Sequence, residues 1–428
     1  MKLYLIIPSL GAGGAERVGV LLANGFVKRG HEVVVFSNLL HSKDYQLDKS
    51  ITIIDISQEE KGQIEKWWHA IRVVRNKVKE NPPNFFIGIM GVFSLVAYLA
   101  CIGLHVPVIA TMHNSFERPS YVPISKTEWI LKFVVNKIFR KVTLLTNADA
   151  LFIGKRLKNT VVMPNPLALE PIDTIAHRNN FILAVGRIND WYYKGFDVII
   201  KSFAKLLRGV NAEGQRVKCN SDDVACKIKR EGWKLQIAGT GSEENLNYLK
   251  QLCKENGVED SVEFLGFRKD VEKLYQDASI FVLSSRYEAF GLVLIEAMSQ
   301  GSACVACDYK GRQREIMSPT STLPSREGES SVESPSLGTR NMNPDARLSR
   351  FRSYDGERTR NLPVEVCETG ILCEPDDVEA LAEAMKKMIE DDEYRESVRI
   401  NAIERSKYYS IENTMNRWEL LLNQILKE

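Results

Sequence analysis

Short apolar runs alternate with longer amphipathic stretches along the first 165 residues. Apolar positions at helical spacing predict helices over residues 15–29 and 63–80. Runs rich in Val, Ile and Phe, bounded by turn residues, predict strands. These strands are expected over residues 2–8, 32–37, 51–56, 85–90 and 107–112. Alternation of this kind is typical of a parallel sheet covered by helices.

The same pattern starts again after residue 178. Strands are expected over 181–186, 233–238, 262–265, 279–284 and 303–307, and helices over 196–208, 243–256, 291–299 and three stretches after Asp376. We therefore predict an α/β fold of two doubly wound domains, 1–166 and 178–409, with a final helix in 410–428. Such sheets bind ligands at the carboxyl ends of their strands, so the site is expected in the cleft between the domains.

Three segments call for a separate interpretation. Residues 85–110 carry no charge and are long enough to cross a bilayer. Gly and Pro residues divide them, however, into strand, helix and strand lengths, which favours a buried β-α-β unit. Residues 209–231 are predicted to be a polar insertion. Residues 318–366 are rich in Ser, Pro, Arg and Glu and are predicted to be disordered.

Composition and charge narrow the class of protein. The chain has 428 residues, 44% of them hydrophobic, and a net charge of +2, which argues against a nucleic-acid partner. Residues 1–175 hold 21 Lys and Arg against 14 Asp and Glu, a net of +7, so the remainder carries 2 − 7 = −5. This asymmetry suggests an anionic partner for the first half; chance surface composition is the alternative. Cys304 and Cys307 lack a second matched pair, so we expect no zinc site and a cytoplasmic protein with reduced thiols.

The strongest chemical signal is the segment from Arg286 to Glu296, in which Glu288 and Glu296 flank Gly291. The segment follows a predicted buried strand, and a helix is expected to start near Phe290. The free N–H groups at a helix start suit a diphosphate. The alternative is a pair of ordinary surface carboxylates.

This segment resembles the E-x7-E motif of the large retaining glycosyltransferase family 4, which has the GT-B fold. Further stretches resemble that family in the same order: GGAERV, a His after a central strand, NP, VGR…KG, AGTGSE, FLGF and GILCEPDD. The resemblance implies that Glu288 contacts donor-sugar hydroxyls and that Glu296 binds the nucleotide ribose. It also implies that backbone N–H groups of Phe290, Gly291 and Leu292 hold the diphosphate, and that the last helix packs on the first domain.

Arg187 and Lys194 follow the strand at 181–186. Two cations in a water-poor cleft stabilise the charge of a departing nucleoside diphosphate, and the family uses this pair in place of a metal. The bulky residues 191–193 between them make the donor geometry harder to predict. His113 ends a strand and matches a family His beside the donor sugar, although a lone His is more often structural.

Glycines mark the other loops expected at the cleft. Gly13 and Gly14 follow the first strand, in the signature that includes Glu16 and Arg17, and in the family this loop faces the donor phosphates. Gly239 and Gly241 lie at a strand end, where close approach to a nucleotide or a tight turn explains them. Phe267, with Gly266 and Arg268, resembles the loop that frames the base.

Residues 64–79 and 125–142 are predicted to be basic, amphipathic helices that carry Trp. This composition is typical of helices that lie on anionic lipid surfaces; the alternative is domain packing with basic outer faces. Docking on the inner face of the plasma membrane would fit a polyprenyl-diphosphate-linked acceptor.

The sequence thus predicts a retaining, metal-independent enzyme of cell-surface polysaccharide assembly. It would move a hexose or N-acetylhexosamine from a nucleotide sugar, by family frequency a UDP-sugar, to a hydroxyl of a glycan or lipid-linked acceptor. Two alternatives remain: a nucleotide-sugar epimerase of similar fold, and a nucleotide-sugar-binding protein whose catalysis residues 318–366 impair.

Overall fold

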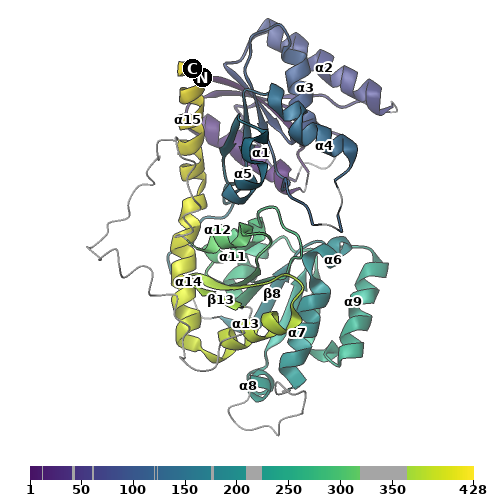
Figure 1. Cartoon of the computed structure of the whole chain (residues 1–428), viewed down its shortest axis with the longest axis vertical. Helices are drawn as coiled ribbons and strands as arrows, with labels where there is room; N and C mark the ends of the chain where they lie inside the picture. The colour runs from purple at the N-terminus through teal and green to yellow at the C-terminus, as the bar shows by residue number, and fades with distance from the viewer. Residues whose placement is uncertain are drawn as a thin grey trace, which may run out of the picture.

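The computed structural model describes residues 1–11, 13–40, 44–59, 62–119, 121–122, 124–174, 178–208, 224–318 and 364–428. Within these residues the chain forms two seven-stranded sheets, one in each of two domains stacked along the long axis (Figure 1). Buried aliphatic and aromatic side chains fill both faces of both sheets. The predicted α/β class with two doubly wound domains is confirmed.

The first sheet has the strand order β3-β2-β1-β4-β5-β6-β7, and all its described pairs are parallel. Its strands are β1 (Lys2–Ser9), β2 (Glu32–Asn38), β3 (Thr52–Asp55), β4 (Phe85–Ile89), β5 (Val108–Thr111), β6 (Lys141–Leu144) and β7 (Thr160–Val162). Its helices are α1 (Gly14–Lys28), α2 (Gln63–Glu80), α3 (Gly91–Cys101), α4 (Lys126–Phe133) and α5 (Asn147–Ile153), with 3₁₀ turns η1 (Val135–Ile138) and η2 (Gly154–Arg156).

The second sheet has the order β10-β9-β8-β11-β12-β14-β13, in which only the β13–β14 pair is antiparallel. Its strands are β8 (Asn179–Val185), β9 (Lys234–Ala238), β10 (Val262–Gly266), β11 (Ala278–Leu283), β12 (Ala303–Cys307), β13 (Val364–Cys367) and β14 (Gly370–Cys373). The α-helices are α6 (Trp191–Lys194), α7 (Phe196–Arg208), α8 (Val224–Glu231), α9 (Glu243–Asn256), α10 (Val271–Asp277), α11 (Leu292–Ser299), α12 (Arg312–Met317), α13 (Val378–Glu390), α14 (Asp392–Ser406) and α15 (Ile411–Lys427). The 3₁₀ turns are η3 (Ile188–Asp190), η4 (Glu259–Ser261) and η6 (Lys407–Tyr409).

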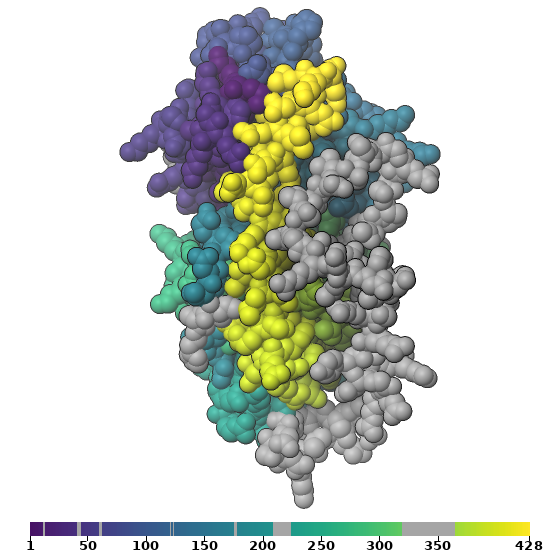
Figure 2. Space-filling view, turned by 90° about the vertical axis from the view of Figure 1, so that its left-hand side faces the viewer, coloured from purple at the N-terminus to yellow at the C-terminus, as the bar shows by residue number. Residues whose placement is uncertain are grey.

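The last helix crosses from the second domain to the first. Figures 1 and 2 show α14 and α15 running along one side of both domains. Trp418 of α15 packs edge-on against Phe26 of α1, with ring centroids 6.0 Å apart. Arg29 at the end of α1 bonds Glu419 at 3.1 Å. Because Trp418 is buried, α15 is part of the core of the first domain.

The apolar stretch 85–110 is a buried β-α-β unit, as predicted. It forms β4, α3 and β5, and all residues of both strands are buried. Within the described residues, no helix combines the length and apolar character needed to span a membrane.

The structure corrects three predictions from the sequence. The helix expected over 125–142 ends at Phe133; η1 follows, and β6 begins at Lys141. Within the predicted polar insertion, 224–231 form α8, whose Val224 and Ile228 are buried; residues 209–223 lie outside the described residues. Of the stretch predicted to be disordered, 364–366 belong to β13, and 319–363 lie outside the described residues.

Candidate active site

Loops at the carboxyl ends of the two sheets meet between the domains. Arg17, in the first turn of α1, donates to the Glu296 carboxylate of α11 at 2.7 Å. A Cβ on Gly14 would lie 3.4 Å from the Leu292 side chain, so the glycine loop packs against the start of α11. The Tyr121 hydroxyl donates to the Arg286 carbonyl at 3.3 Å. The structure therefore brings the glycine loop and the E-x7-E segment together, as expected.

Lys194 and Glu288 form an ion pair inside this region. The Lys194 Nζ lies 2.7 Å from the Glu288 carboxylate, and both side chains are largely buried. The two loops are also joined through the backbone, because the Ser284 hydroxyl donates to the Lys194 carbonyl and the Arg286 N–H donates to the Tyr193 carbonyl. A cation and a carboxylate are thus held side by side at the edge of the sheet.

The start of α11 offers free donors beside this pair. Gly291 precedes the helix with φ at +94°, a left-handed conformation that favours glycine. The N–H groups of residues 290–292 donate to no acceptor within the described residues. Unpaired N–H groups at a helix start favour an anion. The Phe290 side chain is buried against Tyr409, so only its backbone faces this position.

Glu296 is the more deeply buried carboxylate, with 4% of its surface exposed. It accepts hydrogen bonds from Arg17 and from the Tyr275 hydroxyl, the latter at 3.2 Å. Burial raises the pKa of Glu296, and the nearby Arg17 guanidinium opposes that rise. Any ligand hydroxyl that reaches Glu296 must therefore share this carboxylate with Arg17 and Tyr275.

Arg187 stands apart from the Lys194–Glu288 pair. Its side chain is 82% exposed and is paired with Asp190 at 2.6 Å. Asp190 is only three residues away, so this pair is local. The structure brings Lys194, but not the Arg187 guanidinium, to Glu288.

His113 follows β5 and is neutral at physiological pH. Burial lowers its pKa to about 4, although a polar contact with Asn165 opposes the shift. The Thr111 hydroxyl donates to the Gly88 carbonyl, so it accepts from Nε2–H of His113 at 2.9 Å. Nδ1 then carries a lone pair, and it forms no hydrogen bond of good geometry within the described residues. His113 is therefore equipped to accept a hydrogen bond.

The other predicted glycine positions are explained by packing between loops. A Cβ on Gly239 would lie 1.7 Å from the Gly186 carbonyl, and one on Gly241 would lie 2.7 Å from Asn189. The tight-turn interpretation therefore accounts for both glycines. A Cβ on Gly13 would lie 2.0 Å from the Glu16 carboxylate, so a side chain there would require Glu16 to move. Phe267 follows β10 and is 65% exposed.

Comparisons with known proteins give the family. The model described as Glycosyltransferase Family 4 matches residues 12–153, and that described as Glycosyl transferases group 1 matches residues 169–322. The chain is a glycosyltransferase with the GT-B fold. Its two halves thus correspond to the two domains that the family models describe, and the resemblance seen in the sequence is confirmed.

Two relatives of this glycosyltransferase are identical to it at fewer than a third of the aligned positions. An uncharacterized glycosyltransferase of Haemophilus influenzae is 29% identical over 71% of this chain and 80% of its own. A GalNAc-alpha-(1->4)-GalNAc-alpha-(1->3)-diNAcBac-PP-undecaprenol alpha-1,4-N-acetyl-D-galactosaminyltransferase of Campylobacter jejuni is 22% identical over 99% of both chains. Among solved structures, Anabaena HepE in complex with UDP has a TM-score of 0.68 at 17% identity, over 99% of this chain and 100% of its own.

The glycosyltransferase also contains a buried cation that the sequence analysis did not assign to the site. Arg286 has 6% of its side chain exposed and donates to both carboxylate oxygens of Asp197, at 2.6 and 2.8 Å. It also bonds Asp376 and the Tyr192 carbonyl, and its guanidinium stacks over the Tyr192 ring. Arg286 therefore fixes the position of the loop that carries Lys194 relative to the loop that carries Glu288.

Sequence reasoning also missed the partners of Glu296. Arg17 belongs to the quoted GGAERV signature, so the motif drew attention to the residue but not to its contact. Tyr275, on α10, carries no sequence signal of function and is fully buried. Only the packing of α10 on α11 brings its hydroxyl to the carboxylate.

Because folded His113 is neutral, the free energy of unfolding should depend on pH. An unfolded His has a pKa near 6.5, so between pH 6.5 and 4 the unfolded state binds a proton that folded His113 does not. The stabilisation from a neutral His113 is therefore complete above pH 6.5 and falls as the pH drops towards 4. The loss is about 3 kcal/mol, because a shift of one pKa unit corresponds to 1.36 kcal/mol. Denaturant unfolding of wild type and His113→Gln across this range measures it. The stability difference between them should shrink with falling pH; a constant difference would contradict the assignment.

Proposed function

We propose that the protein is a retaining, metal-independent transferase of polysaccharide assembly. It moves a hexose or N-acetylhexosamine from a UDP-sugar to a hydroxyl of a lipid-linked glycan. The observation that carries the proposal is the largely buried Lys194–Glu288 pair beside the free N–H groups at the start of α11. The Campylobacter relative, whose printed name specifies a glycan on PP-undecaprenol, supports this class of acceptor.

The chemistry assigned to each group follows from its charge and position. The bond between the anomeric carbon and the diphosphate oxygen breaks, and the acceptor oxygen bonds the same carbon on the same face. The acceptor proton passes to the departing diphosphate oxygen. Lys194 and the N–H groups of 290–292 stabilise the charge that develops on the diphosphate. Glu288 and Nδ1 of His113 accept hydrogen bonds from sugar hydroxyls.

Closure of the two domains would complete the site. Arg187 is exposed and, among the described residues, its guanidinium pairs with Asp190 alone, so its long side chain is free to exchange that surface pair for the diphosphate. Excluding water strengthens every such interaction, because the local dielectric falls. The acceptor hydroxyl is oriented at the same time.

A product assay tests this function. The protein is incubated with a panel of UDP-, GDP- and other nucleotide sugars and with a bacterial extract of lipid-linked glycans, in the presence and absence of EDTA. A glycan product from one UDP-sugar, with the anomeric configuration of the donor retained and no loss in EDTA, is the expected result. An inverted product, a requirement for added metal, or epimerised nucleotide sugar without transfer would overturn the proposal.

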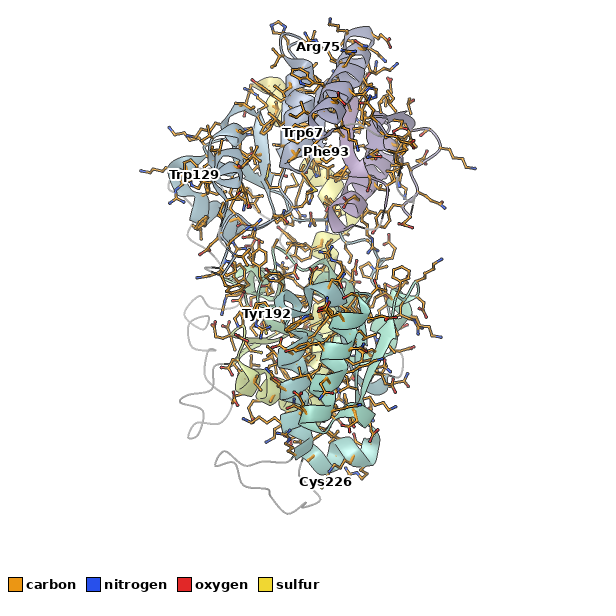
Figure 3. All side chains as sticks on the ribbon, turned by 90° about the vertical axis from the view of Figure 1, so that its right-hand side faces the viewer. Trp67, Arg75, Phe93, Trp129, Tyr192 and Cys226 are labelled. Carbon is orange, nitrogen blue, oxygen red and sulfur yellow. The ribbon has the colours of Figure 1, made fainter. Side chains whose placement is uncertain are left out.

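The first domain has a surface suited to anionic lipid. On α2, Trp68 is 66% exposed and Ile64 72%; on α4, Trp129 is 52% exposed and Ile130 48%. Figure 3 labels Trp67 and Trp129 on this domain. The 18 residues of α2 contain five Lys or Arg and two Glu, a net of 5 − 2 = +3. Exposed Trp beside net positive charge supports docking on a membrane surface.

Replacing Trp68 and Trp129 by Ser should therefore weaken vesicle binding. Each lost indole removes apolar contact with the lipid, and about tenfold weaker binding per residue is expected. Sedimentation with vesicles of phosphatidylglycerol and phosphatidylcholine measures the effect. Ile400→Ser, at an exposed apolar residue of α14, is the matched control. Equal binding of the double variant and the control would argue that α2 and α4 do not reach the lipid.

A further inference from the structure

A pocket of 530 Å³ lies beside the turn that carries Glu288. The carboxyl ends of β12 and β14 form one side of it, and the loop of the first domain at Pro119 and Tyr121 forms the other. Arg286, two residues before Glu288, is in its wall. Because the Tyr121 hydroxyl bonds the Arg286 carbonyl, the pocket adjoins the sugar-transfer site directly.

The charges around this pocket balance. Three cations, Arg286, Lys310 and Arg314, face three carboxylates, Asp308, Glu374 and Asp376, a net of 3 − 3 = 0. The two guanidinium groups are already bound, since Arg286 pairs with Asp376 and Arg314 pairs with Asp308. Outside these pairs, a phosphate or other anion would meet one ammonium, that of Lys310, and one carboxylate, that of Glu374. The balance favours an uncharged ligand.

The hydrogen-bonding groups left available are those that a sugar requires. Glu374 is exposed and has no hydrogen bond or ion pair within the described residues. Lys310 is 57% exposed and lies 3.7 Å from Glu117, a loose contact. The Tyr121 ring is 46% exposed at the mouth. A carboxylate that accepts from hydroxyls, an ammonium that donates to them and an aromatic face together suit a pyranose ring.

Backbone strain also concentrates in this pocket. Within the described residues, four residues other than glycine have positive φ, and two of them, Lys310 at +57° and Asp376 at +68°, line it. This conformation is disfavoured for a residue with a side chain. Such strain tends to persist where a binding site needs a particular backbone shape.

We propose that this pocket binds a neutral sugar residue of the acceptor glycan, adjacent to the sugar whose hydroxyl is glycosylated. The proposal rests on the proposed function and deepens it, because it assigns the acceptor specificity to Glu374, Lys310 and Tyr121. An acceptor that lacks this second sugar loses these contacts and binds more weakly.

Saturation-transfer NMR with uncharged probes tests the pocket. The probes are methyl α-glycosides of glucose, galactose, N-acetylglucosamine and N-acetylgalactosamine, added with UDP to the full chain. Glu374→Gln and Tyr121→Ala alter the pocket, and Glu368→Gln is the matched control, since Glu368 is an exposed carboxylate on the same hairpin that does not line it. Glu288→Ala distinguishes binding at the donor-sugar position. Circular dichroism checks that each variant is folded.

At least one glycoside should bind the wild type and Glu368→Gln alike. Its affinity should fall about tenfold in Glu374→Gln, the loss expected for one hydrogen bond to a charged group, and should persist in Glu288→Ala. Binding that is unchanged in both pocket variants, binding lost only in Glu288→Ala, or no binding of any probe would overturn the proposal. Calorimetry measures the affinity for UDP. Loss of UDP binding would contradict the proposed function, whereas loss of glycoside binding alone would contradict only the pocket, so the two failures are distinguishable.

Discussion

Replacing Lys194 by Met is expected to slow sugar transfer by about 10²–10³-fold, equivalent to about 2.7–4 kcal/mol of transition-state stabilisation. The charge on the diphosphate grows as the sugar bond breaks, so a fixed ammonium contributes more in the transition state than in the bound donor. Lys194 is largely buried against Glu288, which limits screening by water. The value of kcat should therefore fall more than the affinity for the donor. Initial rates with the donor identified in the product assay measure the change.

The double variant with Glu288→Ala gives a sharper result. Glu288 holds Lys194 and, in our proposal, the donor sugar, so the two residues act as one unit. The transfer rate of the double variant should therefore fall by a much smaller factor than the product of the factors in the two single variants. Lys205→Met is the matched control, because Lys205 forms a similar pair with Glu379 on the exposed surface. If Lys194→Met transferred sugar within threefold of the wild-type rate, Lys194 would have no part in stabilising the leaving group.

Replacing Arg286 by Met is expected to lower the free energy of unfolding by about 3–5 kcal/mol. The substitution leaves the Asp197 carboxylate buried without the two hydrogen bonds that Arg286 donates to it. The lost contact with the Tyr192 carbonyl also frees the loop that carries Lys194, so transfer should slow at temperatures where the variant is still folded. Urea unfolding and initial rates measure the two effects.

Asp197→Asn in the same chain should restore part of this stability, because it removes a buried charge that only the half-exposed Lys201, at 3.6 Å, would still face. Arg268→Met is the control for loss of a guanidinium. Arg268 forms a bidentate pair with Asp270 on the surface, where water replaces the lost contacts, so little change is expected. Equal stabilities of Arg286→Met and wild type would show that the buried network does not stabilise the fold. No recovery in the double variant would show that the Asp197 charge is not the cause of the loss.

The sequence predicted regular elements well where one helix or strand stood alone between turn residues. The bounds of α2 and α9 agree with the predicted 63–80 and 243–256. The prediction was wrong at 125–142, where a short helix, a 3₁₀ turn and a buried strand follow one another without a glycine or proline. Their apolar positions merge into one helical pattern, so only the pairing of β6 with β5 and β7 reveals the strand.

The sequence by itself determined the α/β class and the two domains, because periodicity and turn residues act over a few neighbouring positions. The resemblance to the family identified the E-x7-E segment. The sequence could not determine which charges meet. Arg17 and Glu296 are 279 positions apart, Lys194 and Glu288 are 94 apart, and Arg286 and Asp197 are 89 apart. Whether two distant charges form a pair depends on how both sheets and α15 pack, and burial then decides how strongly they interact. Only the tertiary structure therefore placed Arg286 in the site and left Arg187 at the surface.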